Sequence, residues 1–205
     1  MPELPEVETV RRILEERLAG RALRGRRVET PTFYRAPPER CLKGLPGSTL
    51  ERLRRRGKYL LLDFSGGATL NLHLGMSGRL ALGGAEPNGT ARHCRFTMVF
   101  GDRHLRFNDP RRFGRVGCEL PVFGPEPLAS DFEPGYLRRA LRGRKAPIKA
   151  LLMDQAIVAG LGNIYATECL HRAGIRPGRA AGGLGKEELP RLVESVRAVL
   201  REGIA

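Results

Sequence analysis

The sequence predicts an α+β fold in which a strand-rich first part precedes an all-helical second part. Side chains alternate with a period of two in several segments between Leu50 and Phe107, whereas apolar residues recur at helical spacing after Pro134. The turn-forming sequence Gly124-Pro125-Glu126-Pro127 lies where the pattern changes. We therefore expect two domains, residues 1–128 and 129–205.

The first predicted element is a helix near the amino terminus. Pro5 suits the first turn of a helix, where no amide donor is needed. Apolar residues then recur at helical spacing as far as Gly20, at Val7, Val10, Leu14 and Leu18. The sequence after Gly20 is basic and loop-like through Arg24, Arg26 and Arg27.

The residues at the start of this helix can carry out chemistry. If Met1 is removed, Pro2 presents a secondary amine, which can attack an electrophilic carbon and form an iminium. Glu3 and Glu6 could then transfer protons. The alternative is structural, because Pro and Glu also favour helix starts and complement the helix dipole.

Two strand-like segments follow, each with a candidate functional residue. Leu50 to Phe64 predicts a strand pair or one long bent strand, with Lys58 at a Gly bend after three arginines. Lys58 could grip a phosphate and donate a proton, or the basic run could be a solvated sheet edge. After the alternating segment Leu70 to Leu74, Met76 lies between two glycines. Met76 could fill a core or wedge between base pairs.

A hairpin and its following loop complete the first part. The segment from Arg95 to Phe107 predicts two short strands around Gly101-Asp102, and the turn sequence after it carries Arg111 and Phe113. That loop could be an ordinary connection with Phe113 in the core. It could also probe a duplex, with Phe113 stacking on bases and Arg111 occupying the space of a flipped base.

Four helices are predicted in the second part. They span Pro134 to Leu141, Ile148 to Ala156, Ile164 to Ala173 and Glu187 to Glu202. Between the second and third lies the Gly-rich segment from Val158 to Tyr165. The amides that enter the third helix could bind a phosphate together with Asn163, or the segment could be a plain helix connection.

Composition restricts the class of protein. The 205 residues include 36 basic and 22 acidic ones, a formal charge of +14, which favours a polyanionic partner such as nucleic acid. No 18-residue apolar run exists and the amino terminus is too acidic for a secretory signal, so we expect an intracellular protein without membrane association. The four cysteines are scattered, so we expect neither a zinc site nor a disulfide.

Five motifs in order along the chain resemble those of the formamidopyrimidine-DNA glycosylases, bacterial enzymes that remove oxidised purines. They are Pro2-Glu3-Leu4-Pro5-Glu6-Val7-Glu8, Arg56-Gly57-Lys58, His73-Leu74-Gly75-Met76-Ser77-Gly78, Asp109-Pro110-Arg111-Arg112-Phe113-Gly114 and Gly160-Leu161-Gly162-Asn163-Ile164-Tyr165-Ala166-Thr167-Glu168. The resemblance covers essentially the whole chain. It implies an amino-terminal β-sandwich with a helix against it, followed by a helix-two-turns-helix domain.

The resemblance also implies roles for individual residues. Pro2 would attack C1′ of the damaged nucleotide and form an imine, Glu3 would be the main acid and base with Glu6 in support, and Lys58 would assist strand cleavage. After the damaged base flips out, the space that it leaves would be filled, and the duplex held open, by Met76, Arg111 and Phe113. The DNA would further be held by His73, His93, Arg144, Lys149 and Asn163, and His93 departs from the family's usual His-rich pattern.

One departure from the family concerns zinc. The family continues into a four-cysteine zinc finger, and no such ligand set is present in this sequence, so we expect no metal or cofactor here and weaker binding of damaged duplex DNA. We expect a monomer in the cytoplasm, associated with the nucleoid. Two alternatives remain open: a glycosylase for oxidised pyrimidines from the same superfamily, and a non-catalytic binder of damaged DNA.

Overall fold

The structure, a computed structural model, describes residues 2–28, 37–84 and 92–205. Its contacts divide the chain into two units, each described here on its own. The first unit holds Pro2 and Val7–Leu120, and the second holds Glu3–Glu6 and Pro121–Ala205. The predicted boundary after residue 128 stays a prediction. Met1, on which a free Pro2 amine depends, lies outside the described residues.

Helix α1 (Leu4–Leu18) confirms the predicted first helix. Glu3 precedes it, and the Glu6 carboxylate accepts a hydrogen bond from the Glu3 amide at 2.7 Å, which is half of a capping box. The helix ends before Gly20, whose positive φ of 79° suits a residue without a Cβ. The buried apolar stripe of the helix includes Val7, Leu14 and Leu18.

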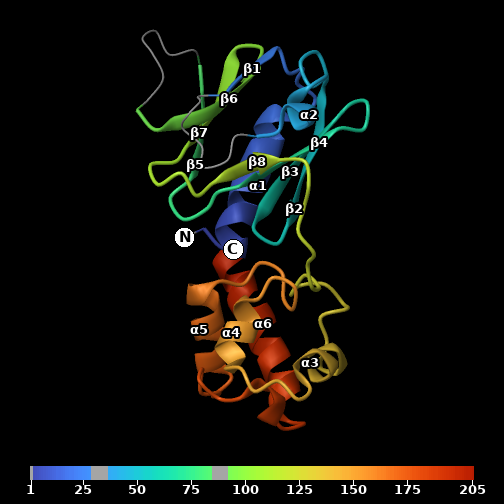
Figure 1. Ribbon diagram of the computed structural model, residues 1–205, viewed down its shortest axis with the longest axis vertical. Coiled ribbons are helices and arrows are strands. Elements are labelled where there is room, and N and C mark those ends of the chain that lie inside the picture. Colours follow the sequence, from blue (N-terminus) through green and yellow to red (C-terminus); the bar gives the residue numbers. More distant parts are fainter. Residues whose placement is uncertain (1, 29–36, 85–91) are drawn as a thin grey trace. The chain divides into compact units, whose positions relative to one another are not determined.

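Two four-stranded antiparallel sheets make up most of the first unit (Figure 1). One sheet has the strand order β1 (Gly25–Val28), β6 (Cys94–Phe100), β7 (Arg103–Asn108), β5 (Arg79–Gly83). The other has the order β2 (Leu50–Arg56), β3 (Tyr59–Phe64), β4 (Thr69–His73), β8 (Arg115–Gly117). The predicted strand pair and the Gly101 hairpin are therefore confirmed. Strand β1 lies where a loop was expected.

The apolar faces of both sheets share one core. Phe64 of the second sheet lies parallel to Phe100 of the first, with ring centroids 6.5 Å apart. Val7, Leu14 and Leu18 of helix α1 pack into the same cluster as buried side chains of both sheets. This common core makes the first unit a β-sandwich with a helix against it, as expected.

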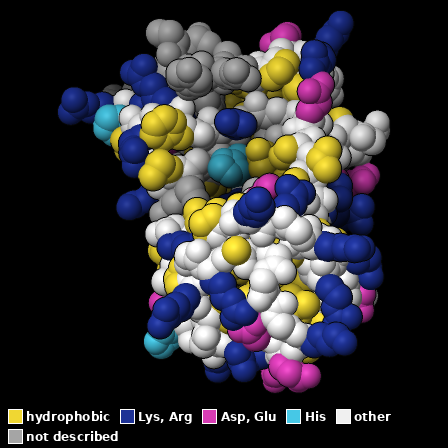
Figure 2. All heavy atoms as spheres, turned by 60° about the horizontal axis from the view of Figure 1, so that its bottom comes forward, with side chains coloured by type: hydrophobic (Ala, Val, Ile, Leu, Met, Phe, Trp, Pro, Cys, Tyr) yellow, Lys and Arg dark blue, Asp and Glu magenta, His cyan; other side chains and the backbone are white. Residues whose placement is uncertain are grey.

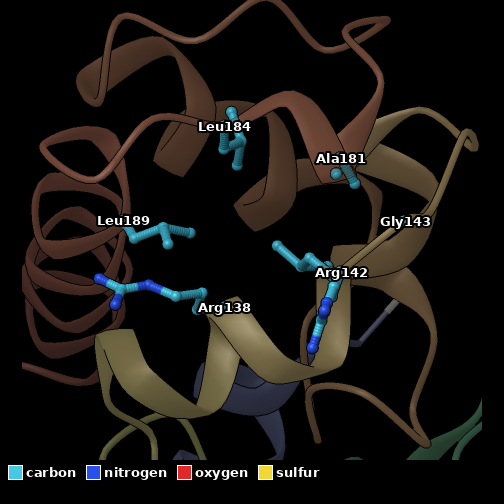
Figure 3. Close-up of a pocket in the computed structure, with 8 residues that line it drawn as sticks. Arg138, Arg142, Gly143, Ala181, Leu184 and Leu189 are labelled. Atoms are coloured by element: carbon cyan, nitrogen blue, oxygen red, sulfur yellow. The ribbon is translucent and has the colours of Figure 1, made fainter.

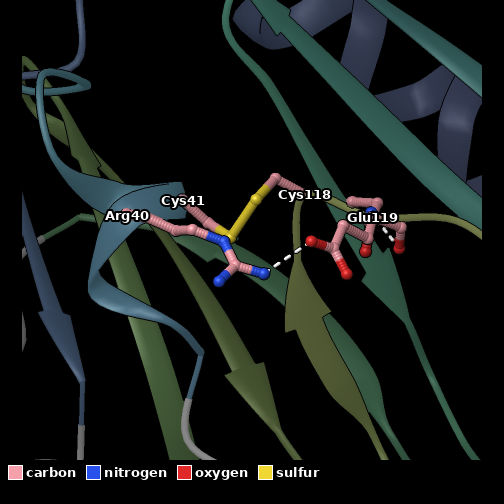
Figure 4. The surroundings of a disulfide bond; sticks show 5 residues. Arg40, Cys41, Cys118 and Glu119 are labelled. Atoms are coloured by element: carbon pink, nitrogen blue, oxygen red, sulfur yellow. Dashed lines mark hydrogen bonds and ion pairs between the residues drawn. A yellow bond between two sulfur atoms is a disulfide. The ribbon is translucent and has the colours of Figure 1, made fainter.

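A disulfide between Cys41 and Cys118 corrects the expectation that the chain has none. Cys41 lies in the short helix α2 (Glu39–Leu42), and Cys118 follows strand β8. Figure 4 shows the bond beside an ion pair between Arg40 and Glu119, whose atoms are 2.5 Å apart. The two cysteines are 77 residues apart in sequence, so spacing gave no sign of the pairing. Cys94 and Cys169 are free and buried.

The second unit is helical. Its elements are α3 (Pro134–Leu141), α4 (Ile148–Met153), α5 (Asn163–Arg172), the 3-10 turn η1 (Ala181–Gly183) and α6 (Glu188–Ile204). Helix α4 ends earlier than predicted because Asp154 begins a turn, in which its carbonyl accepts from the amides of Ile157 and Val158 at 2.9 Å. The predicted apolar face of α6 is buried. The connection between α4 and α5 gives the expected helix-two-turns-helix arrangement.

In the part of the chain that the structure describes, no helix has both the length and the apolar character needed to cross a bilayer.

Asp63 on strand β3 holds a cluster of charges on the second sheet. Its carboxylate accepts from Arg54 Nε at 2.5 Å, from Arg52 Nε at 2.9 Å and from the Thr69 hydroxyl at 2.7 Å. Hydrogen bonding to Arg54 is the largest of the effects that lower the pKa of Asp63 from 3.8 to about 2. Folding therefore favours the ionised form of this carboxyl group.

This pKa predicts how stability depends on pH. Because the folded state lowers the pKa, the contribution of Asp63 is complete above its ordinary pKa of 3.8 and is lost as pH falls towards about 2. We expect Asp63→Asn to lower the free energy of unfolding at pH 7 by about 1 kcal/mol, since both arginines face solvent. The loss should shrink between pH 4 and pH 2 in urea titrations. The solvent-exposed Asp102→Asn is the control, and an equal pH dependence in both variants would contradict the prediction.

Candidate functional site

The Glu3 side chain is seated at the amino-terminal end of helix α5. Its Oε2 accepts from the amides of Gly162 at 2.8 Å and Tyr165 at 3.2 Å, and its Oε1 accepts from the amide of Ile164 at 2.9 Å. Glu3 is 1% exposed. A helix amino terminus offers unpaired N–H groups and a partial positive charge, both of which suit a carboxylate. The sequence analysis left open whether the amides entering this helix bind a phosphate or belong to a plain helix connection, and in the structure these three donate to Glu3.

Two glycines make room for this contact. A Cβ on Gly162 would lie 2.4 Å from the Glu3 carboxyl carbon. Gly160 has a φ of 90°, and a Cβ there would lie 2.6 Å from the Leu4 side chain. The Gly160 carbonyl also accepts from the Leu4 amide at 3.1 Å. Residues 3 and 4 therefore fit against this loop only because it carries glycine at both positions.

Glu6 joins the same cluster through Tyr165. The Tyr165 hydroxyl donates to Glu6 Oε1 at 2.9 Å, while Glu6 Oε2 accepts from the Glu3 amide. Burial, together with the negative charges of Glu6 and Glu3, raises the pKa of the Tyr165 hydroxyl well above its usual range. Tyr165 is therefore a hydrogen-bond donor to Glu6 at neutral pH. Glu6 itself is exposed and could exchange protons with solvent or substrate.

Gln155 fixes the backbone of this loop and was not singled out in the sequence. Its Nε2 donates to the carbonyls of Met153 and Leu161, both at 2.9 Å, and its Oε1 accepts from the Gly160 amide at 2.8 Å. The side chain spans the two turns between α4 and α5. A single glutamine in a turn has no sequence signal that distinguishes it from a surface residue.

Lys58 and His73 are neighbours in the first unit. Lys58 lies in the turn between β2 and β3 and is 8% exposed, and Gly57 before it has a φ of 54°. The His73 ring packs on Tyr59 with centroids 4.6 Å apart. Burial, and then the charges of Lys58 and Arg115, lower the pKa of His73 to about 4. His73 is therefore neutral at pH 7, and its Nδ1 accepts from the Gly75 amide at 3.1 Å, which leaves Nε2–H as its donor.

Two loops of the first unit bring together the three predicted wedge residues. Met76 is 45% exposed and Phe113 is 49% exposed, so neither fills the core. The Arg111 guanidinium lies over the Phe113 ring, 5.0 Å from its centroid. The loops touch through their backbones, because a Cβ on Gly75 would lie 2.6 Å from the Phe113 carbonyl carbon. The structural alternative for Met76 and Phe113, that they belong to the core, is wrong.

Asp109 holds these two loops in place and was not a predicted site residue. It is fully buried, and its Oδ1 accepts from the Ser77 hydroxyl at 2.6 Å and from the Arg111 amide at 3.3 Å. Its Oδ2 accepts from the Gly114 amide at 2.7 Å. The Asp109 backbone carbonyl accepts from Arg95 Nε at 2.8 Å. One carboxylate thus connects the loop of Met76 to the loop of Arg111 and Phe113.

The four remaining predicted residues lie in both units. In the second unit, Asn163 is exposed at the first position of α5, Arg144 is exposed in the loop before α4, and Lys149 is half-buried in the first turn of α4. In the first unit, His93 is half-buried, and its carbonyl accepts from the Asp109 amide at 2.9 Å.

Basic side chains are spread across the surface. Figure 2 shows one face over which Lys and Arg side chains are widely distributed, in keeping with the formal charge of +14. Such a surface attracts polyanions through long-range electrostatics.

A pocket in the second unit is separate from all of these residues. It has a volume of about 120 Å³ between helix α3, the turn η1 and the start of α6. Figure 3 shows Arg138 and Arg142 at its edge, with Leu184, Leu189 and Ala181 facing it. Leu189 is 3% exposed and Ala181 is 1% exposed, so the pocket offers little apolar surface for a ligand. No predicted site residue lines it.

Across residues 2–28, 37–84 and 92–205, no three His, Cys, Asp or Glu side chains come together as metal ligands, so these residues do not fit a zinc finger's ligand set.

Two family profiles match this chain. The profile of the formamidopyrimidine-DNA glycosylase N-terminal domain matches residues 1–116, and that of the formamidopyrimidine-DNA glycosylase H2TH domain matches residues 123–205. Curated relatives agree. The formamidopyrimidine-DNA glycosylase of Cereibacter sphaeroides is 47% identical over all of this chain and 78% of its own length, and that of Geobacter metallireducens is 47% identical over all of this chain and 79% of its own.

Solved structures show the same fold. The Lactococcus lactis formamidopyrimidine-DNA glycosylase, bound non-covalently to DNA that contains an AP site, is 35% identical with a TM-score of 0.90, over 99% of this chain and 82% of that one. The structure of MutM in complex with DNA that contains carbocyclic 8-oxo-G has a TM-score of 0.90 at 34% identity, over 99% of this chain and 79% of that one.

The Asp109 network predicts a loss of stability on substitution. In Asp109→Asn the amide nitrogen cannot accept, so either the Ser77 hydroxyl or the Gly114 amide loses its acceptor inside the protein. We expect the free energy of unfolding to fall by about 1–3 kcal/mol in denaturant titrations. Asp102→Asn, at a side chain that is 77% exposed, should change it by less than about 0.5 kcal/mol. Equal effects of the two substitutions would show that the buried network contributes no more than a surface charge.

Proposed function

Because this chain belongs to the formamidopyrimidine-DNA glycosylase family, we propose that it removes oxidised purines from duplex DNA and then cleaves the strand at the abasic site. The substrates would be 8-oxoguanine and formamidopyrimidines. The observation that carries the proposal is the intact amino-terminal segment, in which Pro2 directly precedes a buried Glu3 that is anchored on helix α5.

Pro2 is the proposed nucleophile. Its secondary amine attacks C1′ of the damaged nucleotide, the bond from C1′ to the base nitrogen breaks, and the base leaves with the bonding electrons. The sugar ring then opens, O4′ takes up a proton, and the nitrogen of Pro2 remains bound to C1′ as an iminium. Pro2 is half-buried and lies two residues before the start of helix α1.

Glu3 and Glu6 are proposed to move the protons in this step. Glu3 is the main acid and base, and its three amide donors hold the carboxylate in one orientation next to Pro2 in sequence. Glu6 supports it from the first turn of α1, where Tyr165 and the Glu3 amide fix both of its oxygens. A positioned carboxyl group of this kind typically contributes 10²–10⁴-fold in rate.

Lys58 is proposed to assist strand cleavage. Glu3, as the main acid and base, takes a proton from C2′ of the iminium, the C3′–O bond breaks, and the phosphate leaves with the bonding electrons. Lys58 binds that phosphate and assists the proton transfer. His73 is proposed to contact the DNA backbone beside it. Since His73 is neutral at pH 7, it acts there as an Nε2–H donor rather than as a cation.

Three residues are proposed to open the duplex. The enzyme must take the damaged base out of the stack, which costs a few kcal/mol. Met76 and Phe113 present exposed apolar tips that can insert between base pairs, and Arg111 lies beside Phe113 to contact the unpaired base. The common anchor at Asp109 supports this joint role.

Further DNA contacts are proposed for His93, Arg144, Lys149 and Asn163. We propose that the protein acts as a monomer in the cytoplasm, associated with the nucleoid, and that residues 1–128 and 129–205 are its catalytic and helix-two-turns-helix domains. We assign no metal ligand to the described residues.

Borohydride trapping tests the proposed amine chemistry. On duplex DNA with one 8-oxoguanine, we expect the wild-type chain to give a covalent cross-link and Pro2→Gly to lose at least about 10²-fold of it, because the secondary amine is gone. A form that retains Met1 is the matched control and should also give none. Duplex binding without any wild-type cross-link would favour the non-catalytic binder, and faster trapping on thymine glycol would favour the oxidised-pyrimidine enzyme.

Gly162→Ala tests the seat of Glu3. The added methyl group would lie 2.4–2.7 Å from the Glu3 carboxyl atoms and displace them from the amides. We expect the single-turnover rate of 8-oxoguanine excision to fall about 10–10²-fold. Gly178→Ala, whose methyl group would meet nothing within 4 Å, is the control and should excise at the wild-type rate. An unchanged rate for Gly162→Ala would refute this placement of Glu3.

A further inference from the structure

A nearly buried ion pair joins helix α1 to strand β2 in the first unit. Glu8 Oε2 accepts from Arg55 Nε at 3.1 Å, and the side chains are 14% and 12% exposed. Glu8 Oε1 accepts from Arg11 Nη2 at 2.9 Å. Other ion pairs among the described residues, such as Arg21–Asp102, Arg40–Glu119 and Arg172–Glu202, lie at the surface, where a pair contributes little. This one is withdrawn from solvent, and such a pair is strongly destabilising to break.

Arg55 makes a second contact that leads to the predicted active-site lysine. Its Nη1 donates to the carbonyl of Gly57 at 3.0 Å. That carbonyl belongs to the peptide bond between Gly57 and Lys58. One guanidinium therefore connects a carboxylate of helix α1 to the turn that carries Lys58. The planar fork of an arginine can hold two acceptors in a fixed geometry, which a lysine ammonium does not do.

The two arginines keep the Glu8 carboxylate ionised. Burial of Glu8 opposes its charge, yet hydrogen bonds and charge from Arg11 and Arg55 outweigh it and hold the pKa of Glu8 below its ordinary value. Glu8 therefore stays ionised at neutral pH and keeps Arg55 in place. If Arg55 served only to hold helix α1 against strand β2, its contact with Glu8 would be enough. Its additional hydrogen bond to the Gly57 carbonyl also restrains the turn that carries Lys58.

We propose that Glu8 and Arg55 are positioning residues for Lys58. The Glu8 carboxylate orients the Arg55 guanidinium, which holds the Gly57 carbonyl and so fixes Lys58 relative to the helix that begins after Pro2. The inference rests on the proposed function and deepens it. The inference predicts different effects on the two proposed chemical steps, because imine formation depends on Pro2, whereas elimination depends on the position of Lys58.

The test uses duplex DNA with a preformed abasic site, wild-type protein, Glu8→Gln, Arg55→Gln and the double variant. We expect each single variant to slow strand cleavage about 10–10²-fold in single turnover. Borohydride cross-linking should be retained, and the Kd for the duplex should stay within about twofold. Because the two residues act as one unit, the cleavage rate of the double variant should lie within about twofold of the rate of the slower single variant.

Arg52→Gln is the matched control. Arg52 lies on the same strand, is paired with Asp63, and its loss removes the same charge; it should cleave at the wild-type rate. Arg55→Lys, which keeps the charge but loses the fork, should fall between wild type and Arg55→Gln.

Three results would overturn the inference: wild-type cleavage by Arg55→Gln, equal loss of cross-linking and cleavage, or equal slowing in Arg52→Gln. Absence of a wild-type cross-link would instead refute the proposed function, on which the inference rests.

Discussion

The Glu3 carboxylate is held by backbone amides of residues 162 to 165, and the arrangement of Leu4, Glu6 and the loop before helix α5 depends on this interaction. It ties the beginning of the chain to a loop 159 residues later, and the surrounding sequence follows from it. Gly160 and Gly162 are glycines because Leu4 and Glu3 occupy the space of their side chains. Gln155 fixes the loop, and Tyr165 carries the contact on to Glu6. The amine of Pro2 thereby precedes a segment whose backbone and side chains are both held.

Much of the fold was predictable because its signals are local. Helices α1, α3 and α6 have regular apolar spacing, and the hairpin of β6 and β7 has a glycine at its turn. Strands β1 and β8 were missed, since four and three residues are too short to show alternation and gain their order by pairing with β6 and β4. The disulfide was missed because Cys41 and Cys118 are far apart in sequence and come together only in the folded unit.

The residues of the candidate site also differ in whether a local sequence signal or only a contact in the fold reveals their role. The sequence analysis singled out residues by the chemistry of their own side chains, and it did not single out the groups that hold them, although several of those groups lie in the same motifs. Asp109 and Ser77 are polar residues in turn sequences, which usually face solvent, but the packing of two loops buries Asp109 and half-buries Ser77. Phosphate binding was one of two interpretations of the start of helix α5, and the anion bound there is the chain's own Glu3. Sequence alone could not separate an internal carboxylate from a phosphate, because the donors required are the same.

The pre-ordered loops of Met76 and Phe113 have a thermodynamic consequence. These apolar tips are exposed, yet the Asp109 carboxylate holds both loops through the Ser77 hydroxyl and the Gly114 amide. Their ordering entropy is therefore lost during folding rather than during association. Stacking between bases would then remove apolar surface from water with little accompanying disorder-to-order change. The heat-capacity change measured on DNA binding would then be negative and modest in size, because it would come from burial of the inserted tips rather than from loop folding.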